Sequence, residues 1–259
     1  MNAQTGGWGA VIIGDEIVRG KRRDGHFAKL VELLGARGLH LAWVEYIGDE
    51  RGRLVDTFRR TFAGNDVVFS CGGIGVTPDD HTRQAAALAA GVQLELHGEA
   101  EREIRARMAA VGYEVTPARL ELGTFPAGSR IIPNPYNRIP GFSLHDHHFV
   151  PGFPEMAWPM IEWVLDTHYR ERFQVGGEEE RAIRVWDGME GELLGLMRRI
   201  EADYPGIVVF SLPSFGNATL RRHVELGVRG APAAVAKSMT EMEAEVARLG
   251  LDFERAYST

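Results

Sequence analysis

The chain has 259 residues, of which 44% are hydrophobic and 25% are charged, and these values exclude an intrinsically disordered protein. Its formal net charge of −7 argues against non-specific nucleic-acid binding as the main function. The single cysteine, Cys71, excludes an intrachain disulfide and a cysteine-rich zinc site and fits a reducing compartment. The sequence has no apolar run near the ~18 residues of a membrane-spanning helix, and no secretory signal at residues 1–9. We therefore expect a cytoplasmic globular protein without nucleic-acid or membrane partners.

The first part of the chain alternates predicted strands and helices. Short apolar runs rich in β-branched residues predict strands at residues 8–13, 39–47 and 66–70. Apolar residues at helical spacing predict helices at 27–34 and 54–62, and a glycine closes each of them. The β-α-β-α-β order is typical of a parallel sheet with helices on both faces.

The alternation then becomes less regular. Two further helices are predicted at residues 82–90 and 99–110. Prolines are frequent in residues 117–153, which predicts short strands and turns rather than helix there. A helix that begins with Pro154 is predicted to run to His168.

A domain boundary is predicted near residues 176–177. Beyond it the predicted elements are, in order, a strand, a helix, two strands and a helix, at residues 181–186, 193–200, 207–212, 219–228 and 232–249. The predicted fold class is therefore α/β. It is a three-layer αβα sandwich with a mostly parallel sheet in residues 1–175, followed by a small α+β domain in residues 178–259.

Three polar loops follow the first three predicted strands, at residues 14–16, 48–50 and 72–80. Chemistry in open α/β sheets gathers at the carboxyl ends of strands, and glycines let backbone N–H groups approach an anion. Thr77 or Thr82 is expected to cap the helix that follows the third loop. Asp79 and Asp80 beside a phosphate would call for a divalent cation. The same segment also fits a turn and a helix cap without any ligand.

Residues 72–82, Gly-Gly-Ile-Gly-Val-Thr-Pro-Asp-Asp-His-Thr, resemble the Gly-Gly-Leu-Gly-Pro-Thr-x-Asp-Asp-x-Thr motif of the molybdopterin-binding (MoaB/Mog-like) domain family. Residues 14–16 with Gly20 resemble the opening Gly-Asp-Glu-x-x-x-Gly element of its CinA branch, the competence/damage-inducible protein A group. Residues 151–156 are similar to the Pro-Gly-x-Pro-x-Glu-Met element of that branch, and Tyr204-Pro205 with the tail resembles its following small domain. The resemblance covers most of the chain.

This resemblance implies a homo-oligomer, a dimer or trimer, that binds a small phosphorylated ligand, molybdopterin or a nucleotide, with a place in molybdenum cofactor metabolism. It implies catalytic roles for Asp49 and Asp80, and binding of magnesium or another divalent cation by Asp49, Asp79 and Asp80. The ligand-binding residues that it implies are Gly14, Asp15, Glu16, Gly72, Gly73, Gly75, Thr77, Thr82, Pro151 and Gly152.

The chemistry stays open between several alternatives. Relatives of this kind include proteins that adenylylate molybdopterin with ATP and magnesium. The CinA branch is associated instead with metal-dependent pyrophosphate cleavage in compounds such as ADP-ribose or FAD. His26 stands where that branch has an amide side chain, and Val76 stands where it has proline. These departures favour a third alternative, a non-catalytic binding or scaffold protein.

Other polar and aromatic groups invite further interpretations. The run His145-Asp146-His147-His148 is expected to be a turn between strands with its histidines on opposite sides, rather than a zinc site. The basic loop of residues 19–23 fits either a clamp on a ligand phosphate or a solvated segment. Cys71 is expected to be packed. Four large residues near the helix at Pro154 are expected in the core or a subunit contact, and they are Met156, Trp158, Met160 and Trp163.

Overall fold

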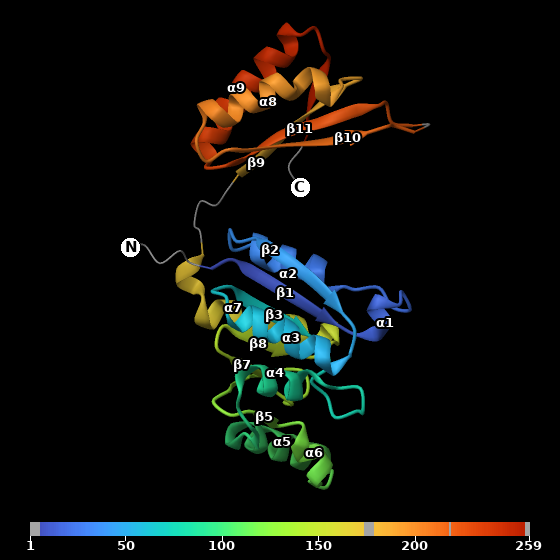
Figure 1. Ribbon diagram of the computed structural model, residues 1–259, viewed down its shortest axis with the longest axis vertical. Helices are drawn as coiled ribbons and strands as arrows, with labels where there is room; N and C mark the ends of the chain where they lie inside the picture. Colours follow the sequence, from blue (N-terminus) through green and yellow to red (C-terminus); the bar gives the residue numbers. More distant parts are fainter. Residues whose placement is uncertain (1–5, 174–178, 218, 257–259) are drawn as a thin grey trace. The chain divides into compact units, whose positions relative to one another are not determined.

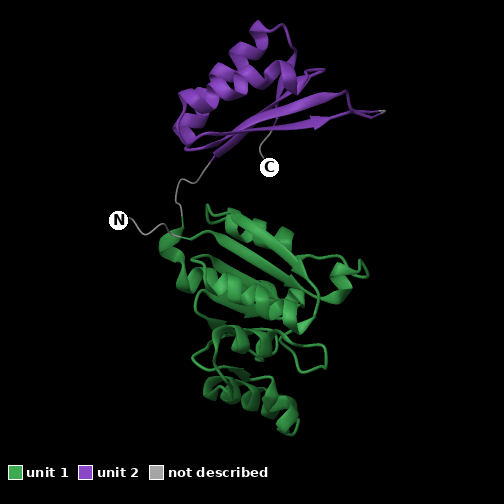
Figure 2. Ribbon diagram, in the orientation of Figure 1, with its two compact units in different colours: residues 1–173 green, residues 174–259 purple. Residues whose placement is uncertain are grey.

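The computed structural model describes residues 6–173, 179–217 and 219–256. The chain divides into two compact units, residues 1–173 and 174–259 (Figure 2). Each unit has its own sheet and its own apolar core.

A six-stranded sheet forms the centre of unit 1 (Figure 1). Its strands are β1 (Trp8–Ile13), β2 (Leu41–Ile47), β3 (Val67–Cys71), β6 (Arg130–Ile132), β7 (Gly141–Leu144) and β8 (His147–Val150). The order is β2-β1-β3-β8-β7-β6. The pairs β1–β2, β1–β3 and β3–β8 are parallel, whereas β7 is antiparallel to both of its neighbours. This confirms the mostly parallel sheet.

Helices cover both faces of this sheet. The helices of unit 1 are α1 (Asp15–Val18), α2 (His26–Gly35), α3 (Arg51–Phe62), α4 (Thr82–Ala90), α5 (Gly98–Val111), α6 (Pro117–Glu121), α7 (Pro154–His168) and the 3-10 turn η1 (Arg170–Arg172). On one face α2 and α7 bury Leu30 and Ile161 against Phe69 of β3. On the other face Phe58 of α3 and Ala85 of α4 belong to a second core. The predicted three-layer αβα sandwich is therefore confirmed.

The apolar runs that predicted strands near residues 8–13 and 66–70 form two central strands of this sheet. Every residue of β1 and of β3 is buried, as expected for apolar strands covered on both faces. In β2 only Ile47 is buried, because β2 is the edge strand. This strand begins at Leu41, two residues later than predicted.

The prediction of no helix in residues 117–153 was wrong. Pro117 begins the five-residue helix α6, where its missing N–H is no loss because the first helical N–H groups have no intrahelical partner. Thr116 caps this helix, since its side chain accepts a hydrogen bond from the N–H of Arg119. The short strands expected in this region are present and include β5 (Thr124–Pro126), but its pairing with β4 (Leu94–Leu96) was not predicted.

Unit 2 is an antiparallel sheet with two helices. Its elements are β9 (Glu179–Trp186), α8 (Glu190–Asp203), β10 (Val208–Ser214), β11 (His223–Gly230), α9 (Pro232–Arg248) and β12 (Phe253–Ala256), and the sheet order is β10-β11-β9-β12. Ile183, Leu226, Ile200 and Met242 share one core, so α8 and α9 pack on the same face. The strand β12 was not predicted. None of the helices in the described ranges is long and apolar enough to cross a membrane.

Candidate functional site

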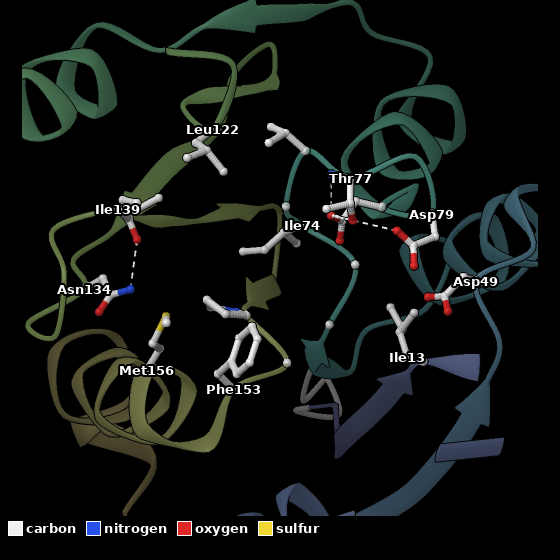
Figure 3. Close-up of a pocket in the computed structure, with 18 of the residues that line it drawn as sticks. Ile13, Asp49, Ile74, Thr77, Asp79, Leu122, Asn134, Ile139, Phe153 and Met156 are labelled. Carbon is white, nitrogen blue, oxygen red and sulfur yellow. Dashed lines mark hydrogen bonds between the residues drawn. The ribbon is translucent and has the colours of Figure 1, made fainter. Parts of the chain in front are cut away.

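A pocket of about 500 Å³ opens in unit 1 where β1, β2, β3 and β8 end (Figure 3). The carboxyl ends of parallel strands are the usual place for ligand sites in such sheets. Most of the predicted site residues line it, and they are Gly14, Glu16, Asp49, Gly72, Gly73, Gly75, Thr77, Asp79, Asp80, Pro151 and Gly152. Asp15 and Thr82 do not line it, but both bond to residues that do.

The glycine-rich loop after β3 presents unpaired backbone donors. Residues 73–76 all line the pocket. Within the described part of the chain, their four consecutive N–H groups have no hydrogen-bond acceptor, whereas the N–H of Gly72 donates to Val150 O at 3.0 Å. Successive backbone N–H groups in a turn that includes left-handed residues form a concave site for anions. This segment therefore has the local structure of a phosphate cradle.

Two glycines of this loop leave no room for a side chain. Gly73 has φ +67°, and a Cβ there would lie 2.4 Å from Oγ1 of Thr82. A Cβ on Gly75 would lie 2.4 Å from Oδ2 of Asp80. Side chains therefore pack closely against both glycines, and the loop itself stays open to the pocket.

Hydrogen bonds from threonines fix the loop. Thr82 is fully buried, and its hydroxyl donates to Gly72 O at 3.0 Å. The N–H of Thr77 donates to Oδ2 of Asp80 at 2.8 Å, and its Oγ1 lies 2.5 Å from carboxylate oxygens of both Asp79 and Asp80. The prediction that Thr77 or Thr82 caps α4 was wrong, because the N-cap is His81 and it makes no side-chain cap bond. Both hydroxyls brace the loop instead.

Acidic side chains line the other edge of the loop. The N–H of Asp15 donates to Oδ2 of Asp49 at 2.8 Å, and the N–H of Asp49 donates to Oδ1 of Asp15 at 3.3 Å. Burial raises the pKa of Asp49, and the charges of Asp15, Glu16 and Asp79 raise it further. Asp79 lies near Asp49 (Figure 3). This concentration of negative charge is a place where a cation would be stabilised.

The three carboxylates predicted to bind a metal do not form a metal-binding group. Among the residues that the structure describes, no three His, Cys, Asp or Glu side chains lie close enough to hold an ion. The physical reason is that Asp80 turns back to brace Thr77. Asp49 and Asp79 remain near each other, and magnesium is commonly held by one or two carboxylates together with water and ligand phosphates. The residues fit an ion completed by a ligand, not a closed metal site.

The far end of the pocket is apolar, and sequence reasoning missed it. Its side chains come from four separate segments and are Ile74, Leu122, Ile139, Phe153 and Met156 (Figure 3). Asn134, which is 4% exposed, shapes this wall: its Nδ2 donates to Ile139 O at 2.9 Å, and its Oδ1 accepts from the N–H of Tyr136 at 3.0 Å. No sequence pattern links these segments, although Asn-Pro-Tyr-Asn is a turn signal that could have drawn attention to residues 134–137.

His26 supports the loop that follows β8. It is 4% exposed, and its Nε2 lies 3.1 Å from Gly152 O. Burial lowers the pKa of His26, although the bond to Gly152 and the charge of Asp24 oppose this effect. A neutral imidazole that faces a carbonyl must carry its proton on Nε2, so His26 donates to Gly152. It holds the pocket wall from behind and is not itself among the lining residues.

The histidine run has the arrangement that was expected. His147 packs against Phe62 with ring centroids 4.4 Å apart, while His148 on the opposite side bonds to Ser143 at 2.8 Å and to Tyr169 at 2.7 Å. Burial lowers the pKa of His147 to about 3.

Two further expectations can be placed in the structure. Cys71 is fully buried, and burial raises the pKa of its thiol, so it is packed as predicted. In the basic loop, Arg19 pairs with Asp15 at 2.6 Å and Arg22 lines the pocket. Near α7, Met160 lies in the core as expected, and Met156, Trp158 and Trp163 are partly buried against that core. Met156 also lines the pocket.

Comparison with known proteins is consistent with this architecture. The model of a family described as "Probable molybdopterin binding domain" matches residues 9–170. A CinA-like protein of Geobacter metallireducens is 31% identical over 202 residues, which are 76% of this chain and 49% of that protein. A protein of Pyrobaculum arsenaticum is 28% identical over 207 residues and covers 78% of both chains. The chain thus spans about half the length of the first of these relatives.

One solved structure supports the fold. It is the crystal structure of the protein CinA with unknown function from Thermoplasma acidophilum, which is 24% identical and superposes with a TM-score of 0.55. The match covers 62% of this chain and 96% of that one. At this identity the likeness establishes the fold of unit 1 and not the ligand.

Proposed function

The chain belongs to the family of probable molybdopterin-binding domains, and from that premise we propose that its pocket binds a pterin or a nucleotide through a phosphate group. The observation that carries this proposal is the run of four unpaired N–H groups at residues 73–76, which faces an apolar wall across one pocket. A phosphate and a planar ring joined in one molecule would match both ends. A role in molybdenum cofactor metabolism is the corresponding biological proposal.

The phosphate would lie against the loop that begins at Gly72. Backbone N–H groups are suited to this task because they stay neutral and cannot rotate away once the loop is fixed. Thr82 and Asp80 fix it, the former at Gly72 O and the latter at Thr77 N. Because neither brace accepts a bond from the N–H groups of residues 73–76, these donors stay available for the ligand.

The ring would lie at the apolar end. Ile74, Phe153 and Met156 offer a surface of large apolar groups, and the volume of about 500 Å³ is within the range of small-molecule sites. Phe153 is 54% exposed, so covering its ring with a ligand would remove apolar surface from water.

A divalent cation fits between the phosphate and the acidic edge. Asp49 and Asp79 would hold it, and ligand oxygens and water would complete its coordination. When bound, magnesium would supply positive charge that offsets the repulsion between the carboxylates and the phosphate. Asp15 would orient Asp49 through their reciprocal backbone bonds.

A ligand series measured by isothermal titration calorimetry tests the proposal. We expect AMP and ADP-ribose to bind in the presence of magnesium, and adenosine to bind at least about tenfold more weakly because it lacks the charged group. Molybdopterin would be compared with its dephospho form in the same way. Equal affinity for the phosphorylated and dephosphorylated member of both pairs would contradict the proposal.

A second candidate function is metal-dependent cleavage of a pyrophosphate bond. It is favoured by the acidic edge, where burial and three neighbouring carboxylates raise the pKa of Asp49. Turnover of ADP-ribose or FAD with magnesium would be measured for the wild type and for Asp49→Asn and Asp79→Asn. We expect these variants to lose turnover by more than they lose affinity. If the wild type binds but yields no product with any divalent metal, the protein is a binding protein.

A further inference from the structure

Arg83 is a buried cation directly behind the glycine-rich loop. It lies in the first turn of α4 and is 1% exposed. Its Nη2 donates to Gly75 O at 2.6 Å, and its Nη1 donates to the carbonyls of Glu121 at 2.6 Å and Thr124 at 3.1 Å. One guanidinium thus joins the loop to the α6–β5 segment, whose Leu122 lines the apolar end.

The charge of Arg83 is only weakly compensated. Its acceptors are neutral carbonyls. Among the residues that the structure describes, the one carboxylate within ion-pair range is that of Glu121, 3.8 Å away on a side chain that is 55% exposed. Burial lowers the pKa of Arg83, with the charges of Glu121 and Asp80 opposing it, but a guanidinium remains protonated in proteins. A desolvated cation among dipoles exerts a stronger potential on its surroundings than a hydrated one.

The bond to Gly75 also sets the direction of a loop donor. In a planar trans peptide the C=O and the N–H point in opposite directions. Arg83 holds the Gly75 carbonyl on the protein side, so the N–H of Val76 points away from Arg83, and Gly75 and Val76 both line the pocket. This N–H is one of the donors without an acceptor within residues 6–173.

We propose that Arg83 is a positioning residue that fixes the Gly75–Val76 peptide and supplies the positive charge by which the loop selects multiply charged phosphates and pyrophosphates. This deepens the function proposed above and rests on it. The acidic edge at Asp49 and Asp79 repels anions, and the positive charge of Arg83, held at Gly75 O, offsets that repulsion. The ligand class is therefore a dianionic phosphate or a pyrophosphate, rather than a carboxylate or a neutral ring.

Titration calorimetry with inorganic pyrophosphate and magnesium tests this role in four proteins: wild type, Arg83→Met, Arg83→Lys and Arg37→Met. Arg83→Met should weaken binding by about tenfold or more, since hydrogen bonds from charged groups contribute at least that much. Arg83→Lys keeps the charge and one carbonyl bond, so it should recover part of the affinity. Arg37 is also largely buried, with 11% of its side chain exposed, and its Nε donates to Asp166 Oδ1 at 2.8 Å. Arg37 does not line the pocket. Its variant should lower the melting temperature and leave pyrophosphate affinity unchanged.

The inference would be overturned by Arg83→Met binding within about twofold of wild type, by Arg83→Lys binding no tighter than Arg83→Met, or by an equal loss in Arg37→Met. If Arg83→Met does not fold, as judged by circular dichroism, Arg83→Gln replaces it with the same expected loss. Absence of pyrophosphate binding by the folded wild-type protein is a different result. It would contradict the phosphate-binding function itself.

Discussion

The two ends of the pocket in unit 1 are built in different ways. The end that we propose binds phosphate, called the phosphate end below, offers backbone N–H groups from one continuous segment, residues 73–76, which hydrogen bonds from neighbouring residues hold in place. The apolar end uses side chains from segments as far apart as Ile74 and Met156. A substitution leaves the backbone N–H groups in place unless it disturbs the conformation of the loop, whereas each apolar side chain can be replaced independently. We therefore expect the phosphate end to define the ligand class and the apolar end to define which ring is accepted.

The largest effect is expected from Gly73→Ala. The added Cβ would meet Oγ1 of Thr82 and force a residue with φ +67° into a strained conformation. Gly112→Ala is the matched control, because Gly112 has φ +71° at the C-cap of α5 with open space around it. Both variants should lose ~1–2 kcal/mol of stability in urea unfolding from backbone strain, and Gly73→Ala should lose more because its Cβ also clashes with Thr82. Only Gly73→Ala should weaken pyrophosphate binding, by about tenfold or more. Equal affinities in the two variants would mean that the loop is not the phosphate site.

A smaller and more selective effect is expected from Phe153→Ala at the apolar end. Loss of the ring should weaken AMP binding about five- to tenfold, since aromatic contacts contribute ~1 kcal/mol or more, and should leave pyrophosphate binding unchanged. Phe215→Ala in unit 2 is the control, because Phe215 is 93% exposed. Titration of both ligands into both variants separates the two ends. A parallel loss of AMP and pyrophosphate affinity would contradict the division between them.

Thr82→Val tests whether the braces behind the loop matter for binding. It removes the hydroxyl that donates to Gly72 O and leaves a buried carbonyl unpaired, which costs ~1 kcal/mol. Thr61→Val removes a similar buried bond to Phe58 O in α3. Both should unfold at lower urea concentration, but only Thr82→Val should weaken AMP binding, by about threefold. If both variants bind AMP like the wild type, Thr82 only stabilises the fold.

Acid is expected to lower the stability of the fold more than it changes either end of the pocket. Burial lowers the pKa of His147 to about 3 and that of His148 well below its ordinary value. Once the pH drops below about 6.5, the unfolded chain therefore binds more protons than the folded one. The free energy of unfolding then falls as the pH is lowered toward 3, by at most ~1.4 kcal/mol per pH unit for each histidine.

Urea unfolding at a series of pH values measures this effect, and His147→Leu should reduce the slope. A slope that is the same in His147→Leu and in the wild type would show that His147 does not contribute to it.

The sequence indicated the glycine-rich loop because its residues are consecutive. A Gly-Gly-x-Gly segment after an apolar strand indicates the loop without any knowledge of distant contacts. The αβα order was equally accessible from alternating apolar patterns. Side-chain directions were not accessible: Thr82 looked like a helix cap, yet its hydroxyl points back to Gly72.

The apolar end of the pocket and the helix α6 were not predicted, because they depend on packing between distant residues that no local sequence pattern indicates. Leu122, Ile139 and Met156 meet only after the chain has folded. Pro117 was interpreted as a helix breaker, although proline is also suited to the first turn of a helix. No sequence pattern singles out Arg83, and only its burial at 1% exposure and its bond to Gly75 O reveal its place behind the loop.

The most direct test of the proposed phosphate site is a titration of ¹⁵N-labelled protein with inorganic pyrophosphate and magnesium, followed by amide chemical shifts. We expect the N–H resonances of residues 73–76 to move downfield together and saturate with the ligand, while that of the control residue Gly112 stays in place. Saturable binding that leaves the resonances of residues 73–76 unmoved would contradict the claim that this loop is the phosphate site.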